Sequence, residues 1–274
     1  MAEQSNFSEK SNLAEKSNFP AISRQVTEMV IAGSTAHAEA AINDTAEQFG
    51  DLAVVAVLET LEPQVAAMYL SAFDGGKLSL ATMLISPRAW AASLAFFAAP
   101  WSDEMIEDEP EVLIESLFAH IHGVVFSSDD GERRSNLIHE ALSTDWGTTA
   151  FAVLLSTAID EIIELANDIH TRGANNSGTT TSDHDVIPLA LEIARSDADA
   201  WDRVLFELFP DWQPGENQLR ARAEVDNEDE EDPDSAYART THELLLRLRK
   251  QVPSSTSSTP KKGARPSLGE DIFS

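Results

Sequence analysis

The amino-acid sequence contains no cysteine among its 274 residues. This absence excludes disulfides, thiolate nucleophiles and zinc or iron–sulfur sites that are held by cysteine. Glycine and proline are also scarce, at 12 residues each, and aromatic residues make up only 7%. Because turn-forming residues are few while Ala, Leu and Glu are abundant, helices are favoured over a many-stranded sheet. The composition therefore predicts an all-α fold, either a compact bundle or a short stack of helices.

Basic residues are scarce as well, since 19 Lys and Arg stand against 47 Asp and Glu and leave a formal net charge of −28. Such a chain repels duplex nucleic acid and anionic membrane surfaces at long range. We therefore expect a protein partner to be basic, although an acidic composition also serves solubility without any partner.

Long hydrophobic runs are missing. The most apolar stretches, residues 89–99 and 150–159, are much shorter than the ~20 residues that cross a bilayer. The first residues lack the basic and then apolar pattern of a secretory signal. We therefore expect no membrane partner and a cytoplasmic location.

The composition changes several times along the chain and divides it into seven predicted segments. Residues 171–183 are rich in turn-forming residues, and residues 224–234 hold eight acidic groups in eleven positions, a run that cannot pack. The predicted segments are a disordered arm (1–19), a main helical domain (20–170), a linker (171–183), a helix pair that packs on the main domain (184–215), an acidic disordered linker (216–235), a basic amphipathic helix (236–252) and a disordered tail (253–274).

Local signals predict where some helices begin and how deeply they are buried. Pro63 and the pair Ser86-Pro87 are typical of helix starts, because proline fits the first helical turn. Ser196 is predicted to cap the second helix of the pair. Residues 147–170 form the longest helical pattern, apolar nearly all round in its first half, which predicts one central buried helix.

The stretch from Leu58 to Ala92 contains short helical patterns with Leu-Glu-Pro junctions, as in VLETLEPQVAAMYLSAF. It resembles the helical units in the N-terminal domain of MgtE-type magnesium transporters and in flagellar FliG. The resemblance covers about 35 residues and implies a stack of short helices. It implies nothing further, because the membrane helices of the transporters have no counterpart in this sequence.

The last six residues, GEDIFS, place an acidic pair before Ile272 and Phe273. This ending resembles the tip of bacterial single-stranded-DNA-binding proteins, which docks its terminal Phe and carboxylate in partner pockets. Here the proline between Ile and Phe is missing, and Ser274 follows the Phe. The resemblance implies that Ile272 and Phe273 contact a partner, as the apolar anchors of unstructured peptides do.

Candidate catalytic and metal-binding groups do not form a recognisable motif. His120 and His122 would face nearly opposite ways on a helix, so they would chelate a metal poorly there. The carboxylates near His170 lack the Glu-x-x-His pattern of helical di-iron sites, because Asn167 stands three residues before the histidine. Neither a G-x-S-x-G elbow, a P-loop nor a G-x-G-x-x-G loop is present. The sequence predicts no catalytic, cofactor-binding or metal-binding residue and no cofactor.

The run Ser182-Asp183-His184-Asp185 brings a hydroxyl, a base and two acids together in sequence. Catalytic triads are assembled in space from separate elements, so this adjacency carries little weight. A loop or helix-cap role for Asp183 or Asp185 is the preferred interpretation.

The charge reverses near the C-terminus, where residues 239–265 contain seven basic residues and one acid, Glu243. The basic helix could fold back on the acidic body, bind a second copy, or contact nucleic acid locally, or it could be a surface helix without a partner. Trp212 lies in the turn FPDWQPG and could be an exposed contact. The predicted partner-binding residues are Trp212, Leu244, Arg247, Leu248, Arg249, Ile272 and Phe273.

These features favour a non-enzymatic, acidic, helical protein that binds other proteins, as an adaptor does. One alternative is an assembly or structural protein of a phage or mobile element. A second alternative is an enzyme with an unrecognised carboxylate site around Glu161, Glu164 and Asp168.

Overall fold

The computed structural model describes residues 19–72, 79–177, 186–210 and 233–253, the side chains of 233–238 excepted. Every regular element in these ranges is a helix, which confirms the predicted all-α fold class. The predicted arm, acidic linker and tail lie almost wholly outside the described residues. At their edges, Phe19 already belongs to helix α2 (Phe19–Ile31), and helix α16 (Pro233–Gln251) begins three residues before the predicted start of the basic helix.

The helices follow one another with short connections. Their bounds are α2 Phe19–Ile31, α3 Thr35–Phe49, α4 Asp51–Thr60, α5 Pro63–Ser71, α6 Leu80–Leu84, α7 Pro87–Leu94, α8 Asp103–Asp108, α9 Pro110–Val125, α10 Gly131–Leu142, α11 Asp145–Leu155, the 3₁₀ turn η1 Ser156–Ala158, α12 Ile159–Arg172, α13 Val186–Ser196, α14 Ala198–Leu208 and α16 Pro233–Gln251.

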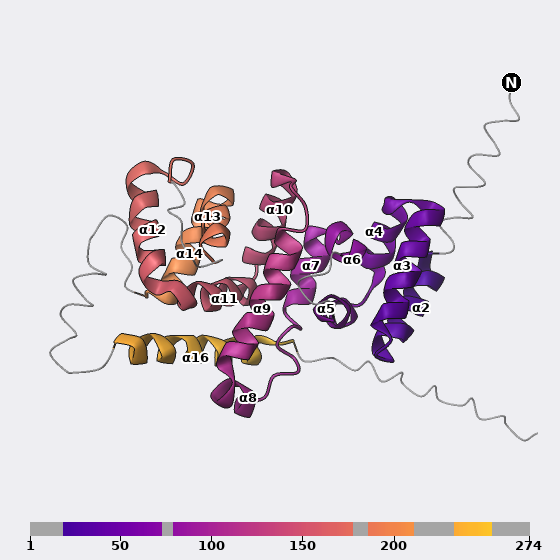
Figure 1. The fold of residues 1–274 in the computed structure, drawn as a ribbon, viewed down its shortest axis with the longest axis horizontal. Coiled ribbons are helices and arrows are strands. Elements are labelled where there is room, and N and C mark those ends of the chain that lie inside the picture. The colour runs from indigo at the N-terminus through magenta and orange to yellow at the C-terminus, as the bar shows by residue number, and fades with distance from the viewer. Residues whose placement is uncertain (1–18, 73–78, 178–185, 211–232, 254–274) are drawn as a thin grey trace, which may run out of the picture.

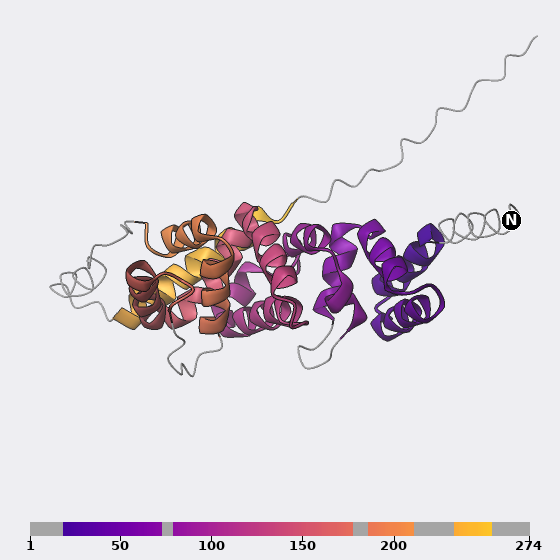
Figure 2. The same cartoon turned by 90° about the horizontal axis from the view of Figure 1, so that it is seen from above.

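The molecule is an elongated stack rather than a single parallel bundle (Figure 1, Figure 2). Helices α2, α3 and α4 pack together at one end, and α12, α13 and α14 lie at the other. Between them, α7 packs against both α5 and α10, while α11 joins α10 to α14. Helix α16 lies along α11 on the lower side of Figure 1 and also touches α8 and η1.

Helix starts follow the local chemistry of the sequence. Ser86 and Ser102 accept hydrogen bonds from the backbone N–H of Ala89 and Met105, which satisfies donors that a helix start leaves open. Helix α14 begins differently from the prediction, because the cap is Asp197 and not Ser196. Asp197 accepts from the N–H of Ala200 at 2.9 Å, and its negative charge also complements the positive end of the helix.

The predicted helix over 147–170 is two helices. The first, α11, is buried along nearly its whole length, as its apolar pattern predicts. The chain then turns through η1, where the hydroxyls of Ser156 and Thr157 donate to the carbonyls of Val153 and Leu154, both at 2.7 Å. Such side-chain bonds compete with regular helical pairing, and the axis changes direction before α12 begins.

Helices α4 and α5 meet at the Leu-Glu-Pro junction at a bend of 119°. Leu61 and Glu62 are extended between the helices, and Pro63 opens α5. In the part of the chain that the structure describes, no single helix is long and apolar enough to cross a membrane; α4 and α5 reach that length and apolarity only when they are taken together across the bend.

Candidate functional site

Helix α16 comes from the C-terminal part of the chain and packs against the helices that precede it. We call helices α2 to α14 the body of the protein. Three leucines on one side of the helix, Leu244, Leu245 and Leu248, are 2% exposed or less. They belong to the same continuous core as the buried residues of α11. We call the surface that α16 covers, formed by α11, η1, α8 and the end of α14, the α16-binding face.

Polar contacts hold the middle and the C-terminal end of α16. Near its midpoint, the hydroxyl of Thr241 donates to the hydroxyl of Ser156 at 2.8 Å. Near its end, the guanidinium of Arg249 donates to the carbonyl oxygen of Trp101 at 2.8 Å and to the carboxylate of Asp103 at 2.5 Å.

Two further side chains join α16 to the body. Arg247 forms an ion pair with Glu207 of α14. The side-chain amide of Gln251 donates to the hydroxyl of Thr149 on α11, at 3.4 Å. The basic helix is thus matched by carboxylates from two different elements of the acidic body.

Apolar burial contributes most to this contact. The side chains of Arg247 and Arg249 are 50% and 36% exposed, and exposed ion pairs contribute about 0–1 kcal/mol each. Burial of one leucine side chain contributes about 1.5–3 kcal/mol. The three leucines therefore stabilise the docked helix more than its charges do, and the charges select its orientation.

The residues predicted to contact a partner are placed in three different ways. Leu244 and Leu248 lie inside the chain's own core, so a partner could reach them only if α16 moved away. Arg247 and Arg249 remain partly exposed and are paired with carboxylates. Trp212, Ile272 and Phe273 lie outside the described residues. Of the arrangements considered for the basic helix, the structure shows the one in which it folds back on the acidic body.

A second notable surface lies beside the end of α16, where α8 and the first half of α9 form a corner at the lower edge of Figure 1. No Lys or Arg occurs between Arg88 and Arg133. Two apolar side chains, Met105 and Val112, are nevertheless 38% and 56% exposed. We call this surface the acidic corner; its exposed carboxylates are Asp103, Glu104, Glu107, Asp108, Glu109, Glu111 and Glu115.

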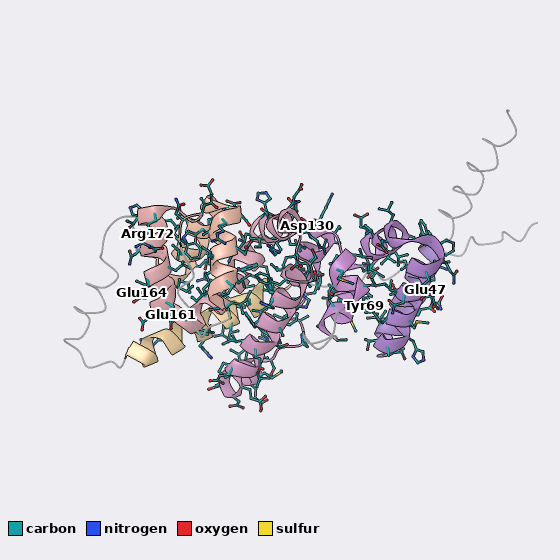
Figure 3. The ribbon with its side chains drawn as sticks, turned by 45° about the horizontal axis from the view of Figure 1, so that its top comes forward. Glu47, Tyr69, Asp130, Glu161, Glu164 and Arg172 are labelled. Atoms are coloured by element: carbon teal, nitrogen blue, oxygen red, sulfur yellow. The ribbon has the colours of Figure 1, made fainter. Side chains whose placement is uncertain are left out.

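The carboxylates of α12 do not gather into a pocket. Asp160 and Glu164 are exposed, and Asp168 pairs with Arg172 one turn later on the same helix, at 3.1 Å. Figure 3 shows Glu161 and Glu164 on the helix at one end of the molecule. Among the described residues, no group of three or more His, Asp or Glu side chains could hold a metal ion.

His120 and His122 have separate surroundings, as their spacing on α9 predicts. The ring of His122 stacks between Phe118 and Phe126, with ring centres 5.1 and 4.6 Å apart. His120 is buried against Phe97, with ring centres 4.7 Å apart, and its Nε2 has no hydrogen-bond partner. Burial in this apolar site lowers the pKa of His120 from 6.5 to about 4.

This shift predicts a pH dependence of stability. The folded protein keeps His120 neutral down to about pH 4, whereas the unfolded chain takes up a proton below about pH 6.5. The stabilising contribution is therefore complete above pH 6.5 and falls as the pH drops, by about 2 kcal/mol at pH 5. His120→Phe keeps the ring stack and removes the titration. Urea unfolding at pH 7.5 and pH 5 should show a smaller loss for the variant, and equal losses would contradict the assignment.

A partly buried polar cluster that the sequence did not reveal joins α3, α5 and α6. The hydroxyl of Tyr69 donates to Glu39 at 2.5 Å, and Ser79 donates to the same carboxylate at 3.0 Å (Figure 3 labels Tyr69). Burial, and then the neighbouring Glu39, raise the pKa of Tyr69. Tyr69 and Ser79 lie 30 and 40 residues from Glu39 in the sequence, so no local sequence pattern links the three residues. The cluster positions the start of α6 against α3.

No protein-family model, curated protein or solved structure matches the chain.

Proposed function

We propose that this is a non-enzymatic interaction protein, an adaptor, and that its acidic corner binds a basic protein partner. The observation that carries the proposal is that two large apolar side chains, Met105 of α8 and Val112 of α9, are exposed in a segment that carries seven exposed carboxylates. Exposed apolar groups set inside a polar rim are typical of protein-binding surfaces.

The two kinds of side chain would have different tasks. Carboxylates gathered on one surface attract a basic partner over distance and exclude acidic ones. Met105 and Val112 would supply the contacts that exclude water once the partner has arrived, and the flexible methionine adapts to partners of different shape. The chain itself offers an example of this chemistry, because Arg249 already binds Asp103 at the edge of the corner.

The proposal predicts that a charge reversal at the corner abolishes partner capture. Glu104→Lys with Glu107→Lys should remove capture of a basic protein in affinity purification from the native host. The matched control is Asp44→Lys with Glu47→Lys, which has the same spacing and the same change in net charge. Its positions are exposed on α3, far from the corner (Figure 3 labels Glu47).

Comparison of the corner variant with the α3 variant distinguishes binding by the acidic corner from binding that depends only on the net charge of the chain. The proposal requires that the wild-type chain and the α3 variant capture the same basic partner, and that the corner variant does not. If both variants lost the partner equally, net charge alone would explain capture. If the corner variant kept it, the corner would have no role.

A further inference from the structure

The helix that covers the α16-binding face is joined to the body by a long connection. The 24 residues 209–232 separate the end of α14 from the start of α16. An extended chain advances about 3.3–3.6 Å per residue, so the connection can span roughly 80 Å. By its length alone, this connection would let α16 leave its face.

The contacts of α16 define what fits this face. Counted from Leu244, the buried leucines occupy positions i, i+1 and i+4, and the arginines that pair with the body occupy i+3 and i+5. On the body side, the partners are the carboxylates of Glu207 and Asp103 and the carbonyl of Trp101. The face therefore recognises a helix with one leucine stripe that has an arginine on each side, one paired with α14 and the other with α8.

We propose that the α16-binding face is a helix receptor, and that its external ligand is a basic amphipathic helix of a partner protein that replaces α16. In the structure, α16 holds the face closed. Recognition of an amphipathic helix by an apolar surface is a common mode of binding, read through anchors spaced by one helical turn. The acidic body adds attraction for a basic helix and repulsion for an acidic one.

The covalent connection sets the affinity that a partner needs. A tethered helix acts on its own face at an effective concentration in the millimolar range, so a free helix of equal quality competes poorly. The face becomes available when α16 is weakened, or when the partner helix binds much more tightly than α16. Helix α16 thereby sets a threshold for binding.

This inference assumes the interaction function proposed above but uses a different surface. The corner variants at Glu104 and Glu107 leave the leucine stripe and both arginine pairs of α16 intact. Loss of partner capture by those variants and failure of helix binding at the α16-binding face are therefore separate results.

The test measures binding of a labelled peptide of residues 239–253 to the full-length chain by fluorescence anisotropy. The wild-type chain should bind it weakly, because α16 occupies the face. Leu245→Asp, which places a carboxylate in the core and releases α16, should bind the peptide at least about tenfold more tightly. A control peptide with Leu244→Ser, Leu245→Ser and Leu248→Ser keeps the charge and should not bind.

A second variant, which changes only partly exposed side chains, keeps the test valid if Leu245→Asp fails to fold. Arg247→Glu with Arg249→Glu turns both ion pairs into repulsions at exposed positions and should also raise peptide affinity. Equal binding by the wild-type chain and both variants would overturn the inference, as would equal binding of the serine peptide. A wild-type chain that forms dimers which the peptide dissociates would overturn the assignment to a partner and identify a second copy as the occupant.

Discussion

Gly147→Ala is expected to lower the free energy of unfolding by about 3 kcal/mol or more, because it forces a carbon atom into the backbone of α10. A Cβ at this position would lie 2.0 Å from the carbonyl oxygen of Ala141 and 2.6 Å from its carbon. The N–H of Gly147 also donates to the hydroxyl of Thr144, which caps α11, so the start of the helix cannot simply move away.

The chain offers a matched control for this substitution. Gly123 also lies within a helix, α9, but a Cβ there would meet no atom within 4 Å. Gly123→Ala should therefore raise the free energy of unfolding by about 0.5–1 kcal/mol, since alanine loses less backbone freedom in a helix. Urea unfolding of both variants, read with a common slope, measures the two changes. Changes of the same sign and size would show that α10 and α11 do not approach as closely as described.

Leu245→Asp is expected to release α16 from the body almost completely. Leu245 is 0% exposed, and burial of an unpaired carboxylate costs several kcal/mol. That cost removes much of the gain from the leucine stripe, so the helix leaves and its arginine pairs break with it. Lys250→Asp places the same carboxylate on the exposed side of the helix and should leave α16 docked.

Release can be followed by limited trypsin digestion. Arg247 and Arg249 are held on the body in the wild-type chain by Glu207, Asp103 and the Trp101 carbonyl. Cleavage after these residues should be much faster in Leu245→Asp than in the wild-type chain or in Lys250→Asp. Equal rates in all three chains would mean that Leu245 does not hold the helix.

Much of the fold could be predicted because its signals are local. Pro63 and Ser86-Pro87 mark helix starts through the fixed shape of proline and the capping hydroxyl, and the structure has helices starting there. The apolar pattern of α11 could be read from residues that are neighbours in sequence. The break at Ser156 could not, because serine occurs both inside helices and at their ends, and the hydrogen bond that it donates to Val153 is open to serine in either setting.

The candidate surfaces were predictable only in part. The reversal of charge after Arg239 and the leucine stripe of the last helix are visible in the sequence. The surface that covers the stripe is not, because an apolar face looks the same whether its own chain or a partner covers it. The pairing of Arg249 with Asp103 joins residues 146 positions apart, and only the packing of α8 beside α16 brings them together.

Docking of α16 on the body underlies both the fold and the helix-receptor inference, and a pair of introduced cysteines tests it directly. The chain has no other cysteine, and the hydroxyl oxygens of Ser156 and Thr241 are 2.8 Å apart, close enough for a disulfide after small adjustments. With Ser156→Cys and Thr241→Cys, mild oxidation should form an intramolecular disulfide in nearly every chain, and adding Leu245→Asp should prevent most of it. Failure of the pair to close with Leu245 intact, or equal closure with Leu245→Asp, would contradict the docked position of α16.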